Sequence, residues 1–288
     1  MLLGFLNICK PEGMTSNHVI SVLRRSLKIK QIGFAGTLDP LAEGVLPVAV
    51  GKAARLIDYL NTEKSYIATA KFGEISTTFD REGEITKIEN APEIKREDII
   101  SKLKDFEGET KQKPPIYSAV HVNGKRLYEL ARKNIKEEEI EIPERTIFIS
   151  KIELVDFNKE EQCAKILIDC SKGTYIRSIV SDLGKMLNSG GVMTNLKRIN
   201  SSGFKIENSI LPDKINTDNV NAYLISPNEV IDSLTTEINE KEFRRIRFGN
   251  SIPTDITSEK PVFTKYNGEI IALAKTDKGL LIPQKVFI

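Results

Sequence analysis

The sequence contains few of the side chains that bind metals or form disulfides. Its 288 residues include no tryptophan, only two histidines, His18 and His121, and three cysteines, Cys9, Cys163 and Cys170. The cysteines share no metal-ligand spacing, and their odd number argues against a disulfide scaffold. We therefore expect neither a metal site nor a framework of disulfides.

Long hydrophobic runs are also missing. No stretch reaches the roughly 18 apolar residues that a membrane-spanning helix needs. The N-terminal residues MLLGFLNICKPEG have no basic segment before the short apolar stretch and no small-residue cleavage site, so they favour a first strand over a signal peptide. These absences predict a soluble, cytoplasmic protein.

The chain has no strong excess of either charge. There are 42 Lys and Arg against 40 Asp and Glu, a formal net charge of +2. The protein is therefore no polycation, and contact with a nucleic acid would depend on local basic patches. Hydrophobic residues make up 40% of the chain, which is typical of a globular protein and excludes a disordered one.

The periodicity of the apolar residues predicts a mixture of strands and helices. A helix follows Thr15 or Ser16, and another runs from Gly173 or Thr174 to Leu187. A loop with three glycines covers residues 31–44, and residues 52–60 suit a short helix. Strands are predicted over residues 5–9, 45–50, 66–72, 146–157 and 163–170.

A change in composition divides the chain near its end. Residues 204–233 are rich in Asn and Asp and resemble a linker, which we assign to a first domain over residues 1–233. From residue 234 short apolar stretches alternate with the turn glycines Gly249, Gly268 and Gly279. This pattern predicts a small all-β module over residues 234–288.

The loop before residue 45 is the most informative segment for chemistry. Asp39 stands between two glycine-bearing turns and directly before Pro40, which favours extended backbone at the aspartate. A carboxylate fixed in this way could act as a nucleophile or as a general acid or base. An aspartate that only forms an Asx-turn would give the same local pattern.

The segment around Asp39 resembles the TruB family of tRNA pseudouridine synthases. Further segments, in order, are similar to other motifs of that family and cover most of residues 5–205. The segments are GFAGTLDPLAEGVLPVAVGKAARL, LNICKPEGMTSNHVI, KSYIATAKFGEISTTFDREGE, QKPPIYSAVHVNGKRLYELAR, CSKGTYIRSIVSDLG and VMTNLKRINSSGF. The C-terminal segments RIRFGNSIP, GEIIALAK and LLIPQKVFI weakly resemble a small RNA-binding module of the PUA type.

The resemblance implies a fold and an activity. The fold is α/β (α+β), a mixed and largely antiparallel sheet flanked by helices, followed by the PUA-like module. The activity is that of an isomerase that converts the T-loop uridine conventionally numbered 55 in tRNA into pseudouridine. The implied partner is the T-arm of tRNA, the implied state is a monomer, and the reaction calls for no cofactor and no metal.

The same resemblance assigns roles to three residues. Pseudouridine formation breaks the C1′–N1 bond of uridine, turns the base and rejoins it through C5. Asp39 matches the indispensable aspartate of the family, and we expect it to be the nucleophile, without specifying the carbon that it attacks. Tyr66 matches a tyrosine that stacks on the base and is a candidate to accept the C5 proton. Arg177 matches an arginine that pairs with the aspartate.

Four further residues are candidates for substrate binding. Lys10 and Lys64 are weaker candidates for contacts with phosphate or with the pocket. Leu196 matches a position that packs against the base, although a leucine of the core would look the same. Phe34 stands where the family generally has His, so it can replace that residue only by stacking. Ser76-Thr77-Thr78 also replaces a common Thr-Asp-Thr, whereas Asp80 is kept.

Three alternatives stay open from the sequence. The chain could be a synthase of the same fold that acts on another RNA, or a non-catalytic protein that binds or folds tRNA. An unrelated aspartate-based glycosidase is the third alternative. Such enzymes usually use two carboxylates about 5–10 Å apart, and neither Glu43 nor Asp80 shows such a role in the sequence.

Overall fold

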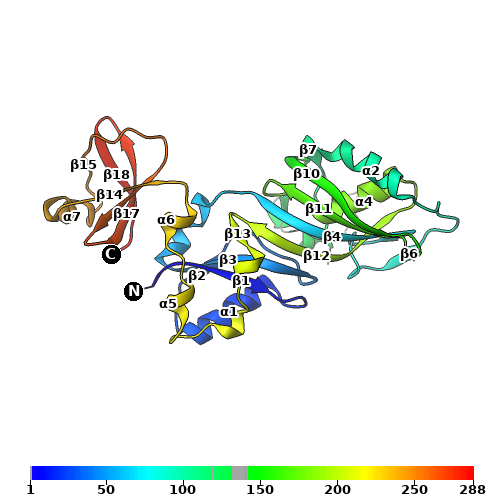
Figure 1. Ribbon diagram of the computed structural model, residues 1–288, viewed down its shortest axis with the longest axis horizontal. Coiled ribbons are helices and arrows are strands. Elements are labelled where there is room, and N and C mark those ends of the chain that lie inside the picture. The colour runs from blue at the N-terminus through cyan, green and yellow to red at the C-terminus, as the bar shows by residue number, and fades with distance from the viewer. Residues whose placement is uncertain (1, 119, 123, 132–139, 141) are drawn as a thin grey trace.

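The computed structural model describes all of the chain except residues 1, 119, 123, 132–139 and 141. A large sheet with helices on its faces forms most of the molecule, and a smaller sheet lies at one end (Figure 1). Within the described residues, the large sheet has nine strands and the small one five. No helix in these residues is both long and apolar enough to cross a membrane.

The large sheet is mixed and largely antiparallel, as predicted. Its main order is β1-β3-β12-β4-β11-β10-β7, and β2 and β13 pair with β3 and β12. Only the β12–β3 pair is parallel among these. The strands are β1 (Leu3–Lys10), β2 (Ile32–Phe34), β3 (Ala42–Gly51), β4 (Lys64–Phe72), β7 (Gly108–Gln112), β10 (Arg145–Asn158), β11 (Cys163–Cys170), β12 (Gly191–Ser201) and β13 (Phe204–Lys205).

Strand β4 shows why the sequence forms this sheet. Tyr66, Ala68, Ala70 and Phe72 alternate with more polar residues and are buried on one face, as the period of two requires. Strand β3 is instead buried almost throughout, which explains its continuous apolar run. The sequence missed β2, because this strand of three residues exists only through its pairing with Val48–Val50.

Helices cover the large sheet. Helix α1 (Ser16–Leu27) begins at Thr15, whose hydroxyl accepts a hydrogen bond from the backbone N–H of His18 at 3.1 Å. Helix α4 (Ile176–Met186) packs along β12, and α2 (Arg96–Leu103) packs against β10. A short helix was predicted over residues 52–60, and residues 52–59 form a 3₁₀-helix.

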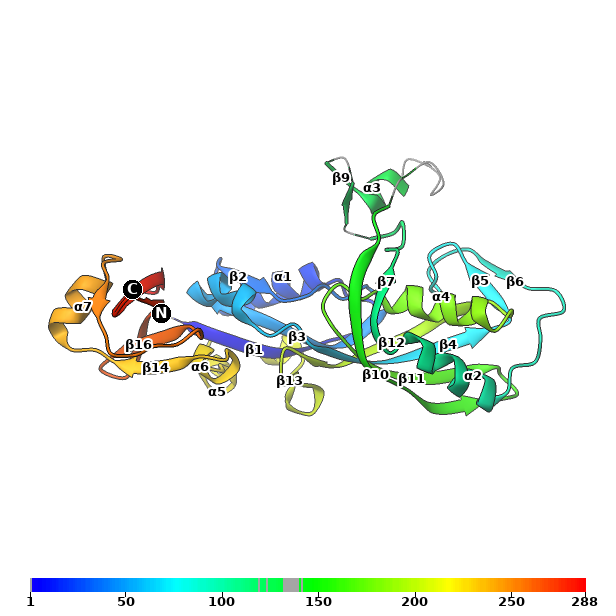
Figure 2. The ribbon, with the colours of Figure 1, turned by 90° about the horizontal axis from the view of Figure 1, so that it is seen from above.

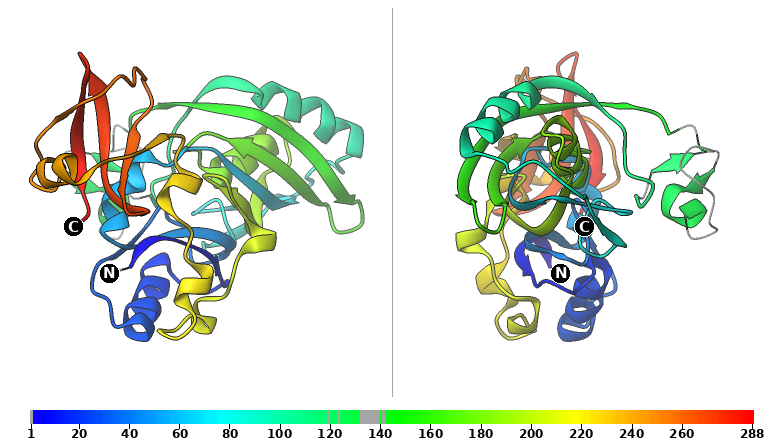
Figure 3. Two further views of the ribbon diagram at one scale, coloured as in Figure 1. Left: turned by 60° about the vertical axis from the view of Figure 1, so that its left-hand side comes forward. Right: turned by 90° about the vertical axis from the view of Figure 1, so that its right-hand side faces the viewer.

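Two small hairpins extend from this body. Strands β5 (Glu74–Ser76) and β6 (Ile85–Lys87) form one of them. Strands β8 (His121–Val122) and β9 (Lys125–Arg126) form the other, which continues into α3 (Leu127–Ala131). This second hairpin and α3 stand away from the sheet, on the face that also carries α1 and α4 (Figures 2 and 3).

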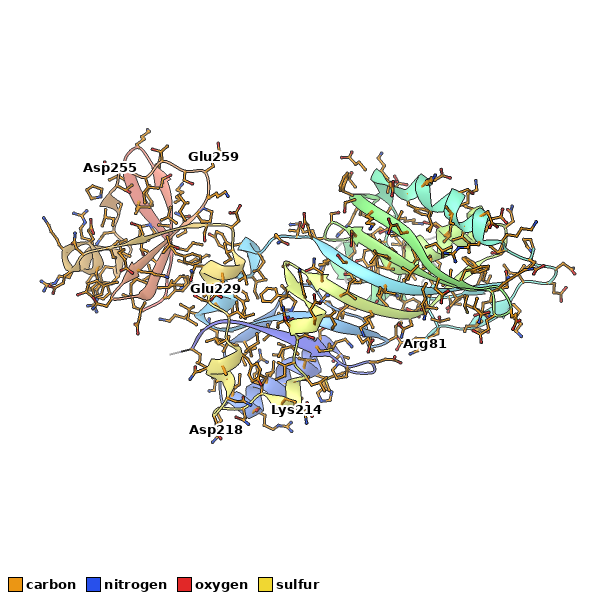
Figure 4. All side chains as sticks on the ribbon, in the orientation of Figure 1. Arg81, Lys214, Asp218, Glu229, Asp255 and Glu259 are labelled. Carbon is orange, nitrogen blue, oxygen red and sulfur yellow. The ribbon has the colours of Figure 1, made fainter. Side chains whose placement is uncertain are left out.

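The region after β13 runs back along β1. It contains short 3₁₀ turns, α5 (Val220–Tyr223) and α6 (Pro227–Val230), and its charged residues Lys214, Asp218 and Glu229 point outward (Figure 4). The backbone groups of Phe5 and Ile225 exchange two hydrogen bonds of 2.8 Å. The linker-like composition therefore belongs to a segment that is fixed to the large sheet.

The small sheet has the order β14-β16-β17-β18-β15. Its buried Phe263, Leu273 and Phe287 belong to the same core cluster as Phe5 and Leu56 of the large body. The elements are β14 (Leu234–Glu237), α7 (Glu240–Ile246), β15 (Ile252–Pro253), β16 (Val262–Tyr266), β17 (Glu269–Asp277) and β18 (Leu280–Val286).

Helix α4 lies unusually close to β12 because glycines form the contact. A Cβ atom at Gly184 would lie 2.2 Å from backbone atoms of Gly190 and Gly191. We predict that Gly184→Ala lowers the free energy of unfolding by roughly 1–3 kcal/mol, as overpacking does. Helix propensity alone predicts instead that alanine raises the free energy of unfolding by about 1 kcal/mol. The sign of the change measured by urea denaturation therefore shows which of the two effects is larger. Lys185→Ala, at the exposed neighbour, should change stability by no more than about 0.5 kcal/mol.

Candidate active site

A cavity of about 710 Å³ opens between the loop after β2, strands β4 and β12, the start of α4 and the chain before β8. Such a volume is typical of a site for a small molecule or a single nucleotide. Six of the seven residues predicted from the sequence line it, and Lys10 does not. The six are Phe34, Asp39, Lys64, Tyr66, Arg177 and Leu196.

The backbone on both sides of Asp39 is fixed by hydrogen bonds. The Ser16 hydroxyl donates to the carbonyl of Leu38 at 3.1 Å and accepts from its N–H at 2.9 Å. The carbonyl of Pro40 accepts from the N–H of Gly13 at 2.7 Å. The Asp39 side chain stays 39% exposed. The loop is therefore rigid, while its carboxylate remains accessible from the cavity.

Lys10 helps to fix this loop instead of lining the cavity. Its side chain is fully buried, and its Nζ donates to the carbonyls of Pro11, Met14 and Pro40 at 2.9, 2.5 and 3.3 Å. Burial lowers the pKa of the Lys10 ammonium to about 8, and the nearby charge of Asp39 opposes that effect. The structure thus places Lys10 behind the aspartate, out of contact with the cavity.

Arg177 lies in the first turn of α4 and pairs with two carboxylates. Its Nε is 3.2 Å from Oδ2 of Asp39, and its Nη1 is 3.3 Å from Oδ2 of Asp80. The guanidinium also donates to the carbonyls of Thr78 at 3.3 Å and Tyr117 at 3.0 Å. The Arg177 side chain is only 7% exposed. All three of its nitrogens therefore have partners, and its orientation is fixed.

Asp80 is a site residue that the sequence reasoning missed. It is buried, and its carboxylate accepts from the Thr78 hydroxyl at 2.5 Å and from the N–H of Glu82 at 3.0 Å. The Ser76 hydroxyl donates to the carbonyl of Asp80 at 2.5 Å. The only signal in the sequence was that Asp80 matches the motif of the family that the chain resembles, although Ser76-Thr77-Thr78 replaces the Thr-Asp-Thr of that motif.

The chain segment that carries Asp80 is tied to the first turn of the protein. Exposed Arg81, labelled in Figure 4, forms an ion pair with Glu12 beyond the end of β1. The backbone N–H of Arg81 donates to the carbonyl of Met193 on β12 at 3.1 Å. These contacts hold the segment against the sheet, so that Asp80 pairs with Nη1 of Arg177 while Asp39 pairs with Nε.

Tyr66 and Leu196 form the apolar wall of the cavity. Tyr66 on β4 is buried, and burial raises the pKa of its phenol, while the charge of Arg198 acts in the opposite direction. Leu196 on β12 lies beside Ala68 of β4 and Ala42 of β3, and it is 5% exposed. Phe34 also contacts this cavity and packs against the core beneath α1.

Arg198 is a second residue without a role in the sequence reasoning, although it lies in a segment that carried the resemblance. Its side chain is fully buried under the Asp39 loop. Its Nε donates to the carbonyl of Val45 at 2.7 Å and its Nη2 to that of Gly36 at 2.9 Å. One guanidinium thereby joins the two ends of the loop that carries Asp39.

The site has no evident place for a metal ion. Across the described residues, no group of three or more His, Cys, Asp or Glu side chains is arranged to hold one. The arrangement instead offers an accessible carboxylate, an arginine that orients it, an aromatic ring and an apolar wall. These groups suit nucleophilic or acid–base chemistry on a planar ligand that contacts the ring.

Comparison with known proteins gives consistent matches. Residues 24–176 match the family described as "TruB family pseudouridylate synthase (N terminal domain)". The chain is 42% identical to a tRNA pseudouridine synthase B of Clostridium kluyveri, covering 91% of this chain and 89% of that protein. It is 39% identical to one of Carboxydothermus hydrogenoformans, covering 99% and 98% of the two chains.

Solved structures show the same fold at lower sequence identity. The chain superimposes on one in the structure of an H/ACA RNP bound to a substrate RNA containing 2′-deoxyuridine. The TM-score is 0.70 and the identity 22%, over 99% of this chain and 85% of the other. At this identity the similarity concerns the fold alone.

The two carboxylates that pair with Arg177 should differ in their effect on stability. Asp80 is 3% exposed and Asp39 39%. We predict that Asp80→Asn lowers the free energy of unfolding by roughly 3 kcal/mol, since it breaks a buried ion pair. Asp39→Asn should change it by less than about 1 kcal/mol. Urea denaturation of both variants measures the difference, and equal effects would contradict this description of the pair.

Proposed function

Because the chain belongs to the TruB family of pseudouridylate synthases and is a tRNA pseudouridine synthase, we propose that its target is the T-loop uridine numbered 55. We further propose that Asp39 is the nucleophile. The single observation that carries this assignment is the accessible carboxylate of Asp39, paired with Arg177 in a cavity large enough for one nucleotide. The enzyme is thus an isomerase that acts on RNA.

The target base has to leave the T-loop to reach Asp39. Extruding a base costs a few kcal/mol. Stacking on the Tyr66 ring, worth roughly 1–3 kcal/mol per base, offsets part of that cost. Leu196, on β12 beside the Tyr66 strand, packs against the base, and Phe34 adds a second aromatic surface at the cavity.

The reaction rearranges bonds without net loss of atoms. The C1′–N1 bond breaks, a C1′–C5 bond forms, C5 loses a proton and N1 gains one. Asp39 assists by attack on C1′ or on C6, and Arg177 holds its carboxylate toward the substrate. This isomerisation needs no oxidant, no reductant and no cofactor.

Tyr66 is the candidate to accept the C5 proton. Because burial raises the pKa of its phenol, the hydroxyl is protonated near neutral pH. A proton transfer to the phenolate should therefore become faster as the pH rises toward that pKa. Stacking, by contrast, depends only on the ring and is independent of pH.

The C-terminal sheet supports a role in RNA binding. We propose that residues 234–288 form a PUA-like module that contacts the tRNA outside the cavity. Phe248 is 74% exposed, and the guanidinium of Arg247 lies 5.0 Å from the centre of its ring. Arg244 and Arg245 precede it on α7. Exposed arginines beside an aromatic ring are suited to phosphates and unstacked bases. We propose a cytoplasmic monomer that binds the T-arm.

Tritium release from uridine labelled at C5 tests the proposed reaction. We predict release from an unmodified tRNA transcript with the wild-type enzyme and none with Asp39→Asn, although both proteins bind the tRNA about equally. Replacing the T-loop uridine by cytidine should abolish release. Release that persists in the cytidine transcript would favour another target, and substantial turnover by Asp39→Asn would make the nucleophile assignment wrong.

Tyr66→Phe separates the two roles of the tyrosine. The ring remains, so tRNA affinity should stay within about twofold of the wild type, whereas tritium release should fall at least about 100-fold, the lower range for general-base catalysis. The release rate of the wild type should rise between pH 7 and 9 if the phenolate accepts the proton. Full activity of Tyr66→Phe would limit Tyr66 to stacking.

A further inference from the structure

A positive charge that lines the cavity, and a buried one behind it, have no negative partner among the described residues. Lys64, the first residue of β4, lines the cavity and forms no hydrogen bond or ion pair within the part of the chain that the structure describes. Arg198 uses two of its nitrogens for backbone carbonyls, while the buried third nitrogen, Nη1, has no hydrogen-bond partner at normal distance among the described residues. The Tyr66 phenol, which faces this guanidinium from β4, is neutral. Buried or half-buried charges usually have partners, because desolvation is costly.

The two unpartnered nitrogens both lie beside Gly36. A methyl carbon placed on Gly36 would lie 3.0 Å from Lys64 Nζ and 3.4 Å from Arg198 Nη1. Gly36 is exposed and has a φ of +70°, and the absence of a side chain lets the two nitrogens approach its backbone. The Gly36 carbonyl is itself held by Arg198, which keeps the loop in register with the two cations.

The carboxylate that lines the same cavity as Lys64, that of Asp39, already has a partner. Asp39 pairs with Arg177, which also binds Asp80. Burial and, after it, the positive charge of Arg198 together lower the pKa of the Lys64 ammonium to about 8. The groups that face Lys64 electrostatically are Arg198, Cys170 and Lys172, and burial raises the pKa of the Cys170 thiol to about 11. The thiol is neutral near pH 8, so the surroundings supply no negative charge.

We propose that Lys64, backed by the buried guanidinium of Arg198, binds one phosphate group of the RNA at the cavity wall beside Gly36. This inference rests on the proposed function, since the RNA that delivers a uridine into the cavity also brings the phosphates next to that nucleotide to its walls. A phosphate oxygen accepts hydrogen bonds from ammonium and guanidinium groups and supplies the missing negative charge. Lys64 makes the direct contact, and Arg198 adds a charge that solvent does not screen.

The two ends of the nucleotide then contact different groups of the cavity. The sugar and base lie toward Asp39 and Tyr66, and a phosphate lies toward Lys64. A side chain at Gly36 would displace the Lys64 ammonium, since its Cβ atom would lie 3.0 Å from Nζ, which gives that glycine a role beyond its backbone angle.

Binding of a T-arm hairpin RNA to Asp39→Asn enzyme tests the subsite without turnover. In that background, Lys64→Met should weaken binding by roughly 10-fold at low salt, the size of one charge-assisted contact. The slope of log affinity against log salt should fall by about 1. Lys165→Met, on the neighbouring strand β11, removes the same charge from an exposed position and serves as the matched control. Equal effects of the two variants would overturn the proposal.

The pH dependence of binding gives a second readout that a structural role would not move. A bound phosphate favours the charged form of Lys64, so affinity should be constant below about pH 8 and should fall as the pH rises above it. Lys64→Arg keeps its charge, so it should bind well at every pH, and Lys64→Met should bind weakly at every pH. A wild-type affinity that stays flat to pH 9.5 would contradict a direct contact.

Methylphosphonate substitution, one position at a time, identifies the phosphate. At the contacted position the neutral linkage should cost the Lys64 enzyme about as much affinity as Lys64→Met does, and it should cost Lys64→Met nothing more. If no position shows this coupling, Lys64 contacts a base or a sugar and the proposal is wrong. All of these measurements report binding, so a failure of tritium release would refute the proposed function without deciding this inference.

Discussion

The site depends on one buried guanidinium held between two carboxylates. Arg177 enters from α4, Asp39 from the loop after β2 and Asp80 from the segment between β5 and β6. These three segments are distant in sequence, and only their packing on β12 and its neighbours brings them together. Because Asp80 is more deeply buried than Asp39, it fixes Arg177 and leaves the exposed carboxylate oriented by a rigid partner.

Buried side chains also fix the loop that carries Asp39. Lys10 and Ser16 bind the backbone on either side of the aspartate, and Arg198 joins the carbonyls at Gly36 and Val45. Each of these side chains uses its polar atoms on main-chain groups that would otherwise be buried without partners. The loop can therefore lack regular secondary structure and still present its carboxylate in one orientation.

Local patterns in the sequence predicted the elements but not the connections between them. The alternation in β4 and the capped, amphipathic α1 are local signals, and both were predicted. Strand β2 and the 3₁₀ form of residues 52–59 depend on tertiary pairing, which a short apolar pattern does not contain. The family resemblance led to Asp39, Tyr66 and Arg177, because such motifs mark residues at the cavity. It misplaced Lys10 and passed over Asp80 and Arg198, whose roles appear only when buried partners are seen.

The distribution of charge around the cavity follows from how these buried groups are satisfied. On one side, the positive charge of Arg177 is more than balanced by Asp39 and Asp80, so this side favours the electron-poor sugar carbon or ring carbon that the proposed reaction attacks. On the other side, Lys64 and Arg198 keep their charge without a carboxylate, which favours an anion. A nucleotide has the same polarity, with its phosphate separated from its base by the sugar. Under the proposed function, these fixed charges orient the extruded nucleotide with its base toward Tyr66 and Leu196, and the charges are already in place when the RNA arrives.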